Sequence, residues 1–321
     1  MIRRYDFAPL DGITKVVFRQ VYHRLFGGAD RYFIPFFSPT DQHILTKRDQ
    51  RELDPAANAG LHVVPQVMTR RAPDFLWAAE VVADMGYTEV NLNLGCPSGT
   101  VTAKGKGSGF LARPEELERF FDEVFASVKL PVSVKTRLGV KEPEEFERLL
   151  DIYNRYPIAC LTIHPRVQKQ FYKGTVHRDW FTWAAERSRN PLCYNGDLVT
   201  VEDCGAFAAD FPAVDAVMIG RGAIADPALL RKLHGGAPAT RQEIQDFTRT
   251  LYQSYQDFYG QAGPAAQRMK EVWFFLIHLF EGGERHDKKM RRLHTPAEYE
   301  AVEAAIFREL PLRDHAEGAF G

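Results

Sequence analysis

Short apolar runs alternate with longer amphipathic stretches through residues 5–219, and this alternation constrains the fold more than any other feature of the chain. The short runs have the length and period of strands, whereas the longer stretches have the spacing of helices. We expect strands at 5–12 (closed by a turn), 31–37, 62–67, 88–94, 131–137, 158–164, 192–194 and 214–219. We expect helices at 14–26 (capped by Thr14), 73–85, 114–128, 143–156, 179–188 and 201–211. Eight strands that alternate with helices predict an α/β fold of the (β/α)8 or TIM-barrel type.

An open doubly wound sheet is the alternative α/β fold, and it requires a glycine-rich fingerprint after the first strand. The first strand here ends in Pro9-Leu10-Asp11-Gly12, which is a different kind of turn. The barrel is therefore favoured. Two stretches fit less simply: Pro65 is awkward within the third strand, and residues 38–60 are too irregular to predict an element.

From Thr240 onward the strand pattern stops. Residues 242–259, 264–280 and 296–308 predict three helices, of which the middle one is strongly apolar. A linker is expected at 235–238, Gly-Gly-Ala-Pro. We therefore expect a barrel domain over 1–236 and a small helical C-terminal domain over 237–321.

Composition restricts the class of protein. The chain has 321 residues, 45% of them hydrophobic, and a net charge of −1, so nucleic-acid binding would have to come from local patches. The four cysteines show no disulfide or metal-ligand spacing, and Cys160 and Cys193 lie in apolar runs typical of a core. The N-terminal residues lack the apolar segment of a signal peptide, and no run approaches the length of a membrane span. We expect a cytoplasmic monomer without a metal.

Cys96 lies where a strand ends. Residues 88–94 alternate apolar and polar side chains, Gly95 breaks the strand, and Pro97 prevents a helix from starting at once. A free cysteine is often a small apolar filler. The polar, loop-side position of Cys96 favours chemistry instead.

Polar or basic groups, or glycine turns, follow nearly every predicted strand. In barrel enzymes the carboxyl ends of the strands meet at one mouth and carry the chemistry. Seven such ends together predict a functional site. Its candidate residues are Pro9, Leu10, Gln66, Asn93, Cys96, Lys135, Arg137, His164, Asn195, Gly196, Asp197, Gly220 and Arg221.

The last two strands end in glycine turns, 195–197 and 220–222. Glycine lets backbone N–H groups approach a phosphate, and Arg221 adds charge, so a phosphate-bearing ligand is favoured over two ordinary turns. Lys135 has several possible roles: stabilising a reduced flavin, forming a Schiff base, or pairing with a carboxylate. His164 either donates to a ring oxygen or satisfies a buried carbonyl. Gln66 matches an imide-like edge such as that of a flavin.

These residues together resemble the tRNA-dihydrouridine synthase family. The matching segments follow the family order and cover nearly the whole chain. They are 8–12, Gln66, 91–98, 104–108, 134–137, 164–166, 170–174, 195–197 and 218–223. The segment 268–273 resembles the basic motif at the start of a tail helix in that family.

The resemblance implies bound FMN, reduced by NADPH or NADH. Pro9, Leu10, Asp11 and Gln66 would lie along the flavin, and Lys135 and His164 at its electron-rich edge. Asn195, Gly196, Asp197, Gly220 and Arg221 would hold its phosphate.

The resemblance also implies that the flavin passes hydride to C6 of a uridine in tRNA while Cys96 donates a proton to C5. The uracil would leave its stack. Asn93 would hold its Watson–Crick edge, with Tyr172 near the nucleotide, and Arg268 and Lys270 would contact RNA. The basic run 285–292 is either a solvated face or a phosphate contact.

Other functions stay open on the residues alone. A flavin enzyme acting on a free pyrimidine, similar to dihydroorotate dehydrogenase, would use the same barrel without needing the basic tail. A tRNA-binding protein with a vestigial barrel would bind RNA without flavin. A Schiff-base lyase would use Lys135.

Overall fold

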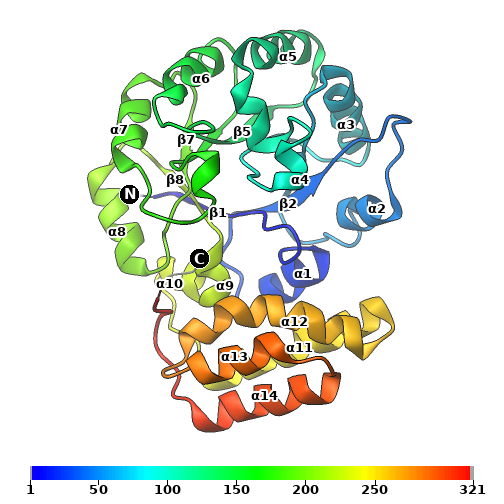
Figure 1. The fold of residues 1–321 in the computed structure, drawn as a ribbon, viewed down its shortest axis with the longest axis vertical. Helices are drawn as coiled ribbons and strands as arrows, with labels where there is room; N and C mark the ends of the chain where they lie inside the picture. Colours follow the sequence, from blue (N-terminus) through cyan, green and yellow to red (C-terminus); the bar gives the residue numbers. More distant parts are fainter. Residues whose placement is uncertain (1, 319–321) are drawn as a thin grey trace.

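Eight parallel strands close into a barrel in the computed structural model, which describes residues 2–318 (Figure 1). Met1 and residues 319–321, at the ends of the two expected domains, lie outside the described residues. β8 pairs with β1 and closes the ring, with Asp6 opposite Met218. The expected TIM-barrel fold is therefore confirmed. The strands are β1 (Arg4–Phe7), β2 (Arg31–Phe37), β3 (Val63–Val67), β4 (Val90–Leu94), β5 (Val132–Arg137), β6 (Leu161–His164), β7 (Leu192–Tyr194) and β8 (Ala216–Ile219).

Strand periodicity decides which side chains enter the barrel. On β4 the apolar Val90, Leu92 and Leu94 pack in the main hydrophobic core, whereas Asn91 and Asn93 join a buried polar network with other inward residues. A small apolar cluster, which includes Phe33, Cys160 and Cys193, fills part of the interior. Cys160 and Cys193 are therefore core residues, as expected.

Prolines on neighbouring strands coincide with an irregular ladder. Pro65 lies within β3, opposite Ile34 of β2, and Pro35 follows on β2 itself. The register of the β2–β3 pair shifts between Ile34 and Phe37. Because proline has no N–H to donate, an irregular ladder at this point is expected.

Helices surround the barrel between the strands (Figure 1). Those of the barrel are α1 (Val16–Leu25), α2 (Lys47–Leu53), α3 (Ala72–Asp84), α4 (Gly99–Thr102), α5 (Pro114–Ser127), α6 (Glu145–Tyr153), α7 (Arg178–Arg187), α8 (Val201–Asp210), α9 (Arg221–Ala225) and α10 (Leu229–Leu233). The sequence did not predict α2, α4, α9 or α10. The expected Thr14 cap is wrong: Lys15 is the N-cap of α1, and the Thr14 hydroxyl accepts from the Leu10 N–H at 2.8 Å.

The C-terminal region is helical, as expected, with one helix that was not predicted, α13. Its helices are α11 (Arg241–Tyr259), α12 (Ala262–Leu276), α13 (Glu284–Arg292) and α14 (Pro296–Glu309). Figure 1 shows α12 and α11 directly below α1. No helix among residues 2–318 is long and apolar enough to span a membrane.

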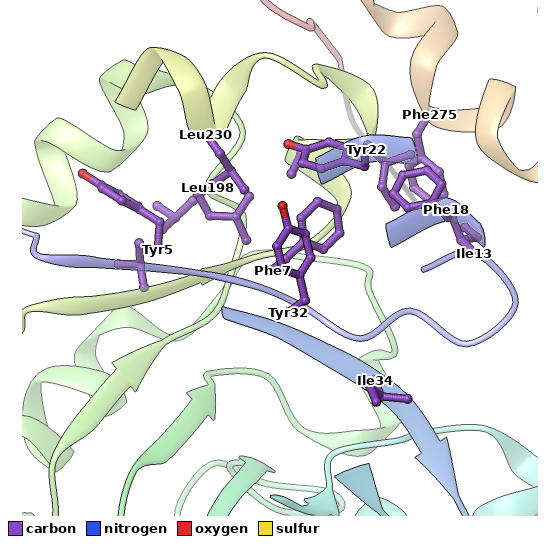
Figure 2. Close-up of a cluster of buried hydrophobic side chains, with 14 of the residues drawn as sticks. Tyr5, Phe7, Ile13, Phe18, Tyr22, Tyr32, Ile34, Leu198, Leu230 and Phe275 are labelled. Carbon is purple, nitrogen blue, oxygen red and sulfur yellow. The ribbon is translucent and has the colours of Figure 1, made fainter. Parts of the chain in front are cut away.

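An aromatic core joins the helical region to the barrel. The Phe247 ring of α11 lies 5.9 Å from Phe18 and 5.5 Å from Phe26, both next to Tyr22 on the α1 side. Figure 2 shows this cluster running from β1 and β2 across α1 to Phe275 of α12. Such aromatic pairs bury large areas. The tail is thereby held against the β1–α1 side of the barrel, next to the loop that follows β1.

Candidate active site

The Cys96 turn is held by the strand that precedes it. The Asn93 side-chain oxygen accepts from the backbone N–H of Gly95 at 3.0 Å and of Cys96 at 2.9 Å. On the other side, the Cys96 carbonyl accepts from the Ser108 N–H and hydroxyl at 3.0 and 2.8 Å. Gly107 has φ +56°, and a Cβ there would lie 2.8 Å from that carbonyl oxygen. The 99–112 segment therefore fits closely around the thiol-bearing turn.

A directional amide network continues from Asn93 into the barrel. The Asn93 amide donates to the Gln66 oxygen at 2.7 Å, and the Gln66 amide donates to Asn91 at 2.8 Å. Asn91 then donates to Ser133 at 2.8 Å, and Ser133 donates to Glu89. Each buried amide uses both its ends, as buried polar groups must. The Asn93 oxygen already accepts two bonds, so a contact from Asn93 to uracil is left to the second hydrogen of its amide nitrogen. Gln66 keeps one amide hydrogen and one lone pair of its oxygen for a contact to flavin. Both contacts stay predictions.

Cations gather beside Cys96, on the neighbouring strand β5. Lys135 is paired in register with Asn93 on β4, and Arg137 with His164 on β6. Arg137 donates to the Gly95 carbonyl at 2.8 Å, so it also holds the Cys96 turn. Lys135 Nζ has no hydrogen-bond or ion-pair partner among the described residues.

Burial and neighbouring charge shift the pKa values at this mouth. Desolvation, assisted by Arg137, lowers the pKa of Lys135 to about 7, and desolvation lowers that of Arg137 to about 10. The pKa of His164 lies well below its usual value, because it is buried beside four cations, so the imidazole is neutral. Burial chiefly raises the pKa of Cys96. The thiol therefore stays protonated at neutral pH.

The loops after β7 and β8 are fixed to each other. The Asn195 amide donates to the Met218 carbonyl at 2.7 Å, and the Asp197 carboxylate accepts from Arg221 at 2.7 Å. A Cβ on Gly222 would lie 2.6 Å from the Leu198 carbonyl oxygen, so glycine is required for this close approach. Gly220 lies against Leu10, which places the turn after β1 beside these loops.

Arg166 is a site residue that the strand-end analysis did not select. It is buried, donates to both Asp197 oxygens at 2.9 and 2.5 Å, and lies 3.3 Å from the His164 ring nitrogen. Arg166 follows the end of β6 by two residues, and its side chain folds back over the mouth. Its position in the segment 164–166 was the available indication in the sequence.

Tyr172 covers the same group of cations. Its ring centroid lies 5.3 Å from the guanidinium of Arg137 and 5.1 Å from that of Arg221, which are cation–π distances. Tyr172 is 46% exposed, so it lies between the cations and solvent. A nucleotide at the mouth would meet this ring.

The remaining predicted residues make other contacts. Asp11 is exposed and paired with Arg48 at 2.8 Å and Lys15 at 3.2 Å. Arg268 donates to the Gly12 carbonyl at 3.0 Å and so joins the tail to the β1 loop, whereas Lys270 donates to a carbonyl within the tail. Pro9 is half-buried at the mouth. No cluster of three potential metal ligands occurs in the part of the chain that the structure describes.

The fold and this mouth define a (β/α)8-barrel protein with a protonated thiol beside a cluster of cations. A family model described as dihydrouridine synthase matches residues 6–310, and the chain belongs to that family. A "Probable tRNA-dihydrouridine synthase 1" from Synechocystis is 31% identical over 284 residues, 83% of this chain and 76% of that protein.

Two further proteins show the range of similarity. A "tRNA-dihydrouridine(16) synthase" from Ralstonia nicotianae is 31% identical over 239 residues, 72% of this chain and 73% of that protein. Among solved structures, morphinone reductase matches with a TM-score of 0.51 at 15% identity, over 73% of this chain and 86% of that one. At this identity the match concerns the barrel fold.

Proposed function

We propose that this protein is an FMN-dependent tRNA-dihydrouridine synthase that uses NADPH or NADH as reductant. Family membership and the names of the relatives support this activity. The observation that carries the proposal is the pairing of a protonated thiol, Cys96, with an excess of positive charge at one barrel mouth. A reductase that adds hydride and a proton to a pyrimidine needs both an acid and a site for an anionic cofactor.

The charges of the mouth fit FMN. Four cations surround His164, whereas Asp197, the carboxylate that faces them, is shared by two of the four. Burial chiefly lowers the pKa of Lys135, and the neighbouring charge of Arg137 lowers it further. An anion bound there would relieve the repulsion.

The residues that would hold FMN divide between two ends of the mouth. Arg221, Asn195, Gly196, Asp197 and Gly220 would bind the phosphate. Lys135 and His164 would lie at the electron-rich edge of the ring, and Pro9, Leu10, Asp11 and Gln66 would line it. When bound, FMN supplies the hydride that reduces the uracil.

Cys96 would donate the second hydrogen as a proton. Its raised pKa keeps the proton on sulfur until a stronger base develops at the uracil C5. Asn93 and Arg137 both bind the Gly95–Cys96 peptide group, through the Cys96 N–H and the Gly95 carbonyl, and would hold the sulfur in position. Their contribution is orientation, to which catalysis is sensitive at the level of about an ångström.

The helical domain, 237–321, would bind the tRNA. Arg268 at the contact between tail and barrel is well placed to meet RNA that enters the mouth, and Tyr172 would pack near the reacting nucleotide. Lys270 and the basic helix α13 would contribute charge along the tail, where phosphate contacts dominate affinity.

The experiment is to purify the protein, identify its chromophore, and incubate it with NADPH and unmodified tRNA. We expect a yellow protein that releases FMN and forms dihydrouridine at a defined tRNA position. A protein that carries FMN but leaves every uridine unchanged, while it turns over free dihydroorotate, would instead indicate the free-pyrimidine enzyme. Deletion of the gene followed by mapping of dihydrouridine would identify the position.

A further inference from the structure

A second cavity lies beside the barrel mouth, between the barrel and the tail. Its volume is about 350 Å³, and it is bounded by the loop after β1, the start of α1, α2, and the adjoining ends of α11 and α12. Figure 1 shows α1 and α2 above α11 and α12 at this place. Asp11 lines the cavity and also contributes to the electrostatic environment of Cys96. The cavity is therefore close to the reactive mouth and shares Asp11 with it, whereas Arg48, Arg51 and Phe258 belong to the cavity alone.

One wall of the cavity is aromatic. Phe258, near the end of α11, is 38% exposed and offers part of its ring to the cavity. Its ring lies 5.0 Å from Tyr259 in an edge-to-face arrangement, and the guanidinium of Arg51 lies 5.5 Å from its centroid. The Tyr259 hydroxyl accepts from Arg268 at 3.2 Å, which fixes that ring in the wall.

The other wall is basic. Four cations line the cavity, namely Lys15, Arg48, Arg51 and Arg268, against two carboxylates, Asp11 and Glu52. Glu52 is turned to the buried Arg19 at 3.1 Å, and Asp11 is shared by Lys15 and Arg48. Arg51 has no ion-pair partner among residues 2–318. Arg268 is paired with Glu271 at 2.7 Å. The cavity keeps an excess of positive charge, because two cations share Asp11 and Arg51 is unpaired within the described part of the chain.

A partly exposed aromatic ring next to unpaired positive charge is the chemistry that recognises one nucleotide. The base stacks on the ring, and the phosphate is bound by the cations. We propose that this cavity holds a second, non-reacting nucleotide of the tRNA, with its base against Phe258 and its phosphate at Arg48 and Arg51. This inference rests on the proposed function, because it takes tRNA as the substrate.

The same chemistry would suit the adenosine phosphate half of the nicotinamide reductant, so the test must separate a tRNA nucleotide from the reductant.

Phe258→Ala and Arg51→Ala are compared with wild type in three assays: binding of unmodified tRNA, steady-state kinetics with tRNA, and flavin reduction by NADPH without tRNA. Phe258→Tyr keeps the ring and should restore binding. Arg187→Ala is the matched control, because Arg187 stacks on Trp183 at 4.8 Å on α7, away from the tail.

We expect Phe258→Ala to weaken tRNA binding and raise the KM for tRNA by about 5- to 100-fold, with kcat within about twofold. Arg51→Ala should reduce the slope of log affinity against log salt by about one. The Arg187→Ala variant and the KM for NADPH should both stay unchanged.

Several results would overturn the inference: wild-type tRNA affinity in both variants, a rise in the KM for NADPH instead, or no tRNA binding by the wild-type protein. The proposed function fails separately, when wild-type protein binds tRNA and forms no dihydrouridine. In that case the binding titrations still decide whether the cavity receives a nucleotide.

Discussion

Replacement of Asn93 by alanine should displace Cys96 without unfolding the barrel. The side chain makes three hydrogen bonds, two to backbone N–H groups of the Cys96 turn and one to Gln66. At about 1 kcal/mol net for each bond, the expected loss of stability is about 3 kcal/mol. For a protein of this size, that corresponds to a fall in Tm of roughly 6 to 12 °C.

The matched control is Asn91→Ala. Asn91 lies in the same buried network and loses two hydrogen bonds, to Gln66 and Ser133, but it does not contact the Cys96 turn. The expected loss of stability is about 2 kcal/mol. Asn93→Asp is a second comparison, since it keeps the acceptor for the turn, while it loses the donor to Gln66 and adds a negative charge beside the Gln66 oxygen.

Two assays separate position from stability. Burial raises the pKa of Cys96, so a released turn should expose more thiolate, and Asn93→Ala should react several-fold faster with iodoacetamide at pH 8. The other three cysteines are buried and do not compete. The kcat of Asn93→Ala for tRNA reduction should fall about 100-fold, whereas Asn91→Ala should keep the wild-type alkylation rate and kcat. Equal alkylation rates and equal kcat values in the two variants would refute the positioning role of Asn93.

Three further predictions concern the loops and the cations. Gly107→Ala should lower the free energy of unfolding by about 1–3 kcal/mol in a denaturant titration, because Gly107 has a positive φ and an added Cβ would meet the Cys96 carbonyl oxygen. Gly99→Ala is the control and should leave the stability unchanged, since a Cβ there meets open space. Lys135, with a pKa of about 7, is mostly neutral at pH 8, and an anion beside it raises that pKa. Binding of FMN at pH 8 should therefore take up a proton, seen by calorimetry in buffers of different ionisation enthalpy; an equal uptake in Lys135→Gln would contradict this. Arg221→Ala should raise the Kd for FMN about 10- to 100-fold, since a charge-assisted hydrogen bond is lost. The Kd of Arg221→Lys should lie between those of wild type and Arg221→Ala. An unchanged Kd in both variants would exclude a phosphate contact.

The barrel was predictable because its strands carry a clear period. Residues 88–94 alternate, and the structure buries Val90, Leu92 and Leu94 on one face and both asparagines on the other. Very short helices, such as α9 and α10, and helices with few apolar residues were missed. In α2, Leu53 is the only strongly apolar residue, although the Thr46–Asp49 capping box that starts this helix was present in the sequence.

The candidate site was predictable to the extent that it follows strand ends. Barrel geometry brings every carboxyl end to one mouth, and the structure gathers Cys96, Lys135 and His164 there. Contacts made by loops that fold back could not be predicted from the sequence. Arg166 lies past its strand, and Asp197 binds two arginines from a left-handed backbone conformation, φ 45°, that no periodicity encodes. The basic run 285–292 likewise has too few apolar residues to predict a helix from its sequence. It nevertheless forms α13, in which His286 and Met290 are buried.

The most direct test of the central claim separates the two halves of the reaction in Cys96→Ala. Flavin reduction by NADPH needs no acid at that position, whereas protonation of the uracil does. We predict that the variant binds FMN and is reduced by NADPH at the wild-type rate, and that its reduced form fails to produce dihydrouridine in tRNA. Wild-type formation of dihydrouridine by Cys96→Ala would contradict the account.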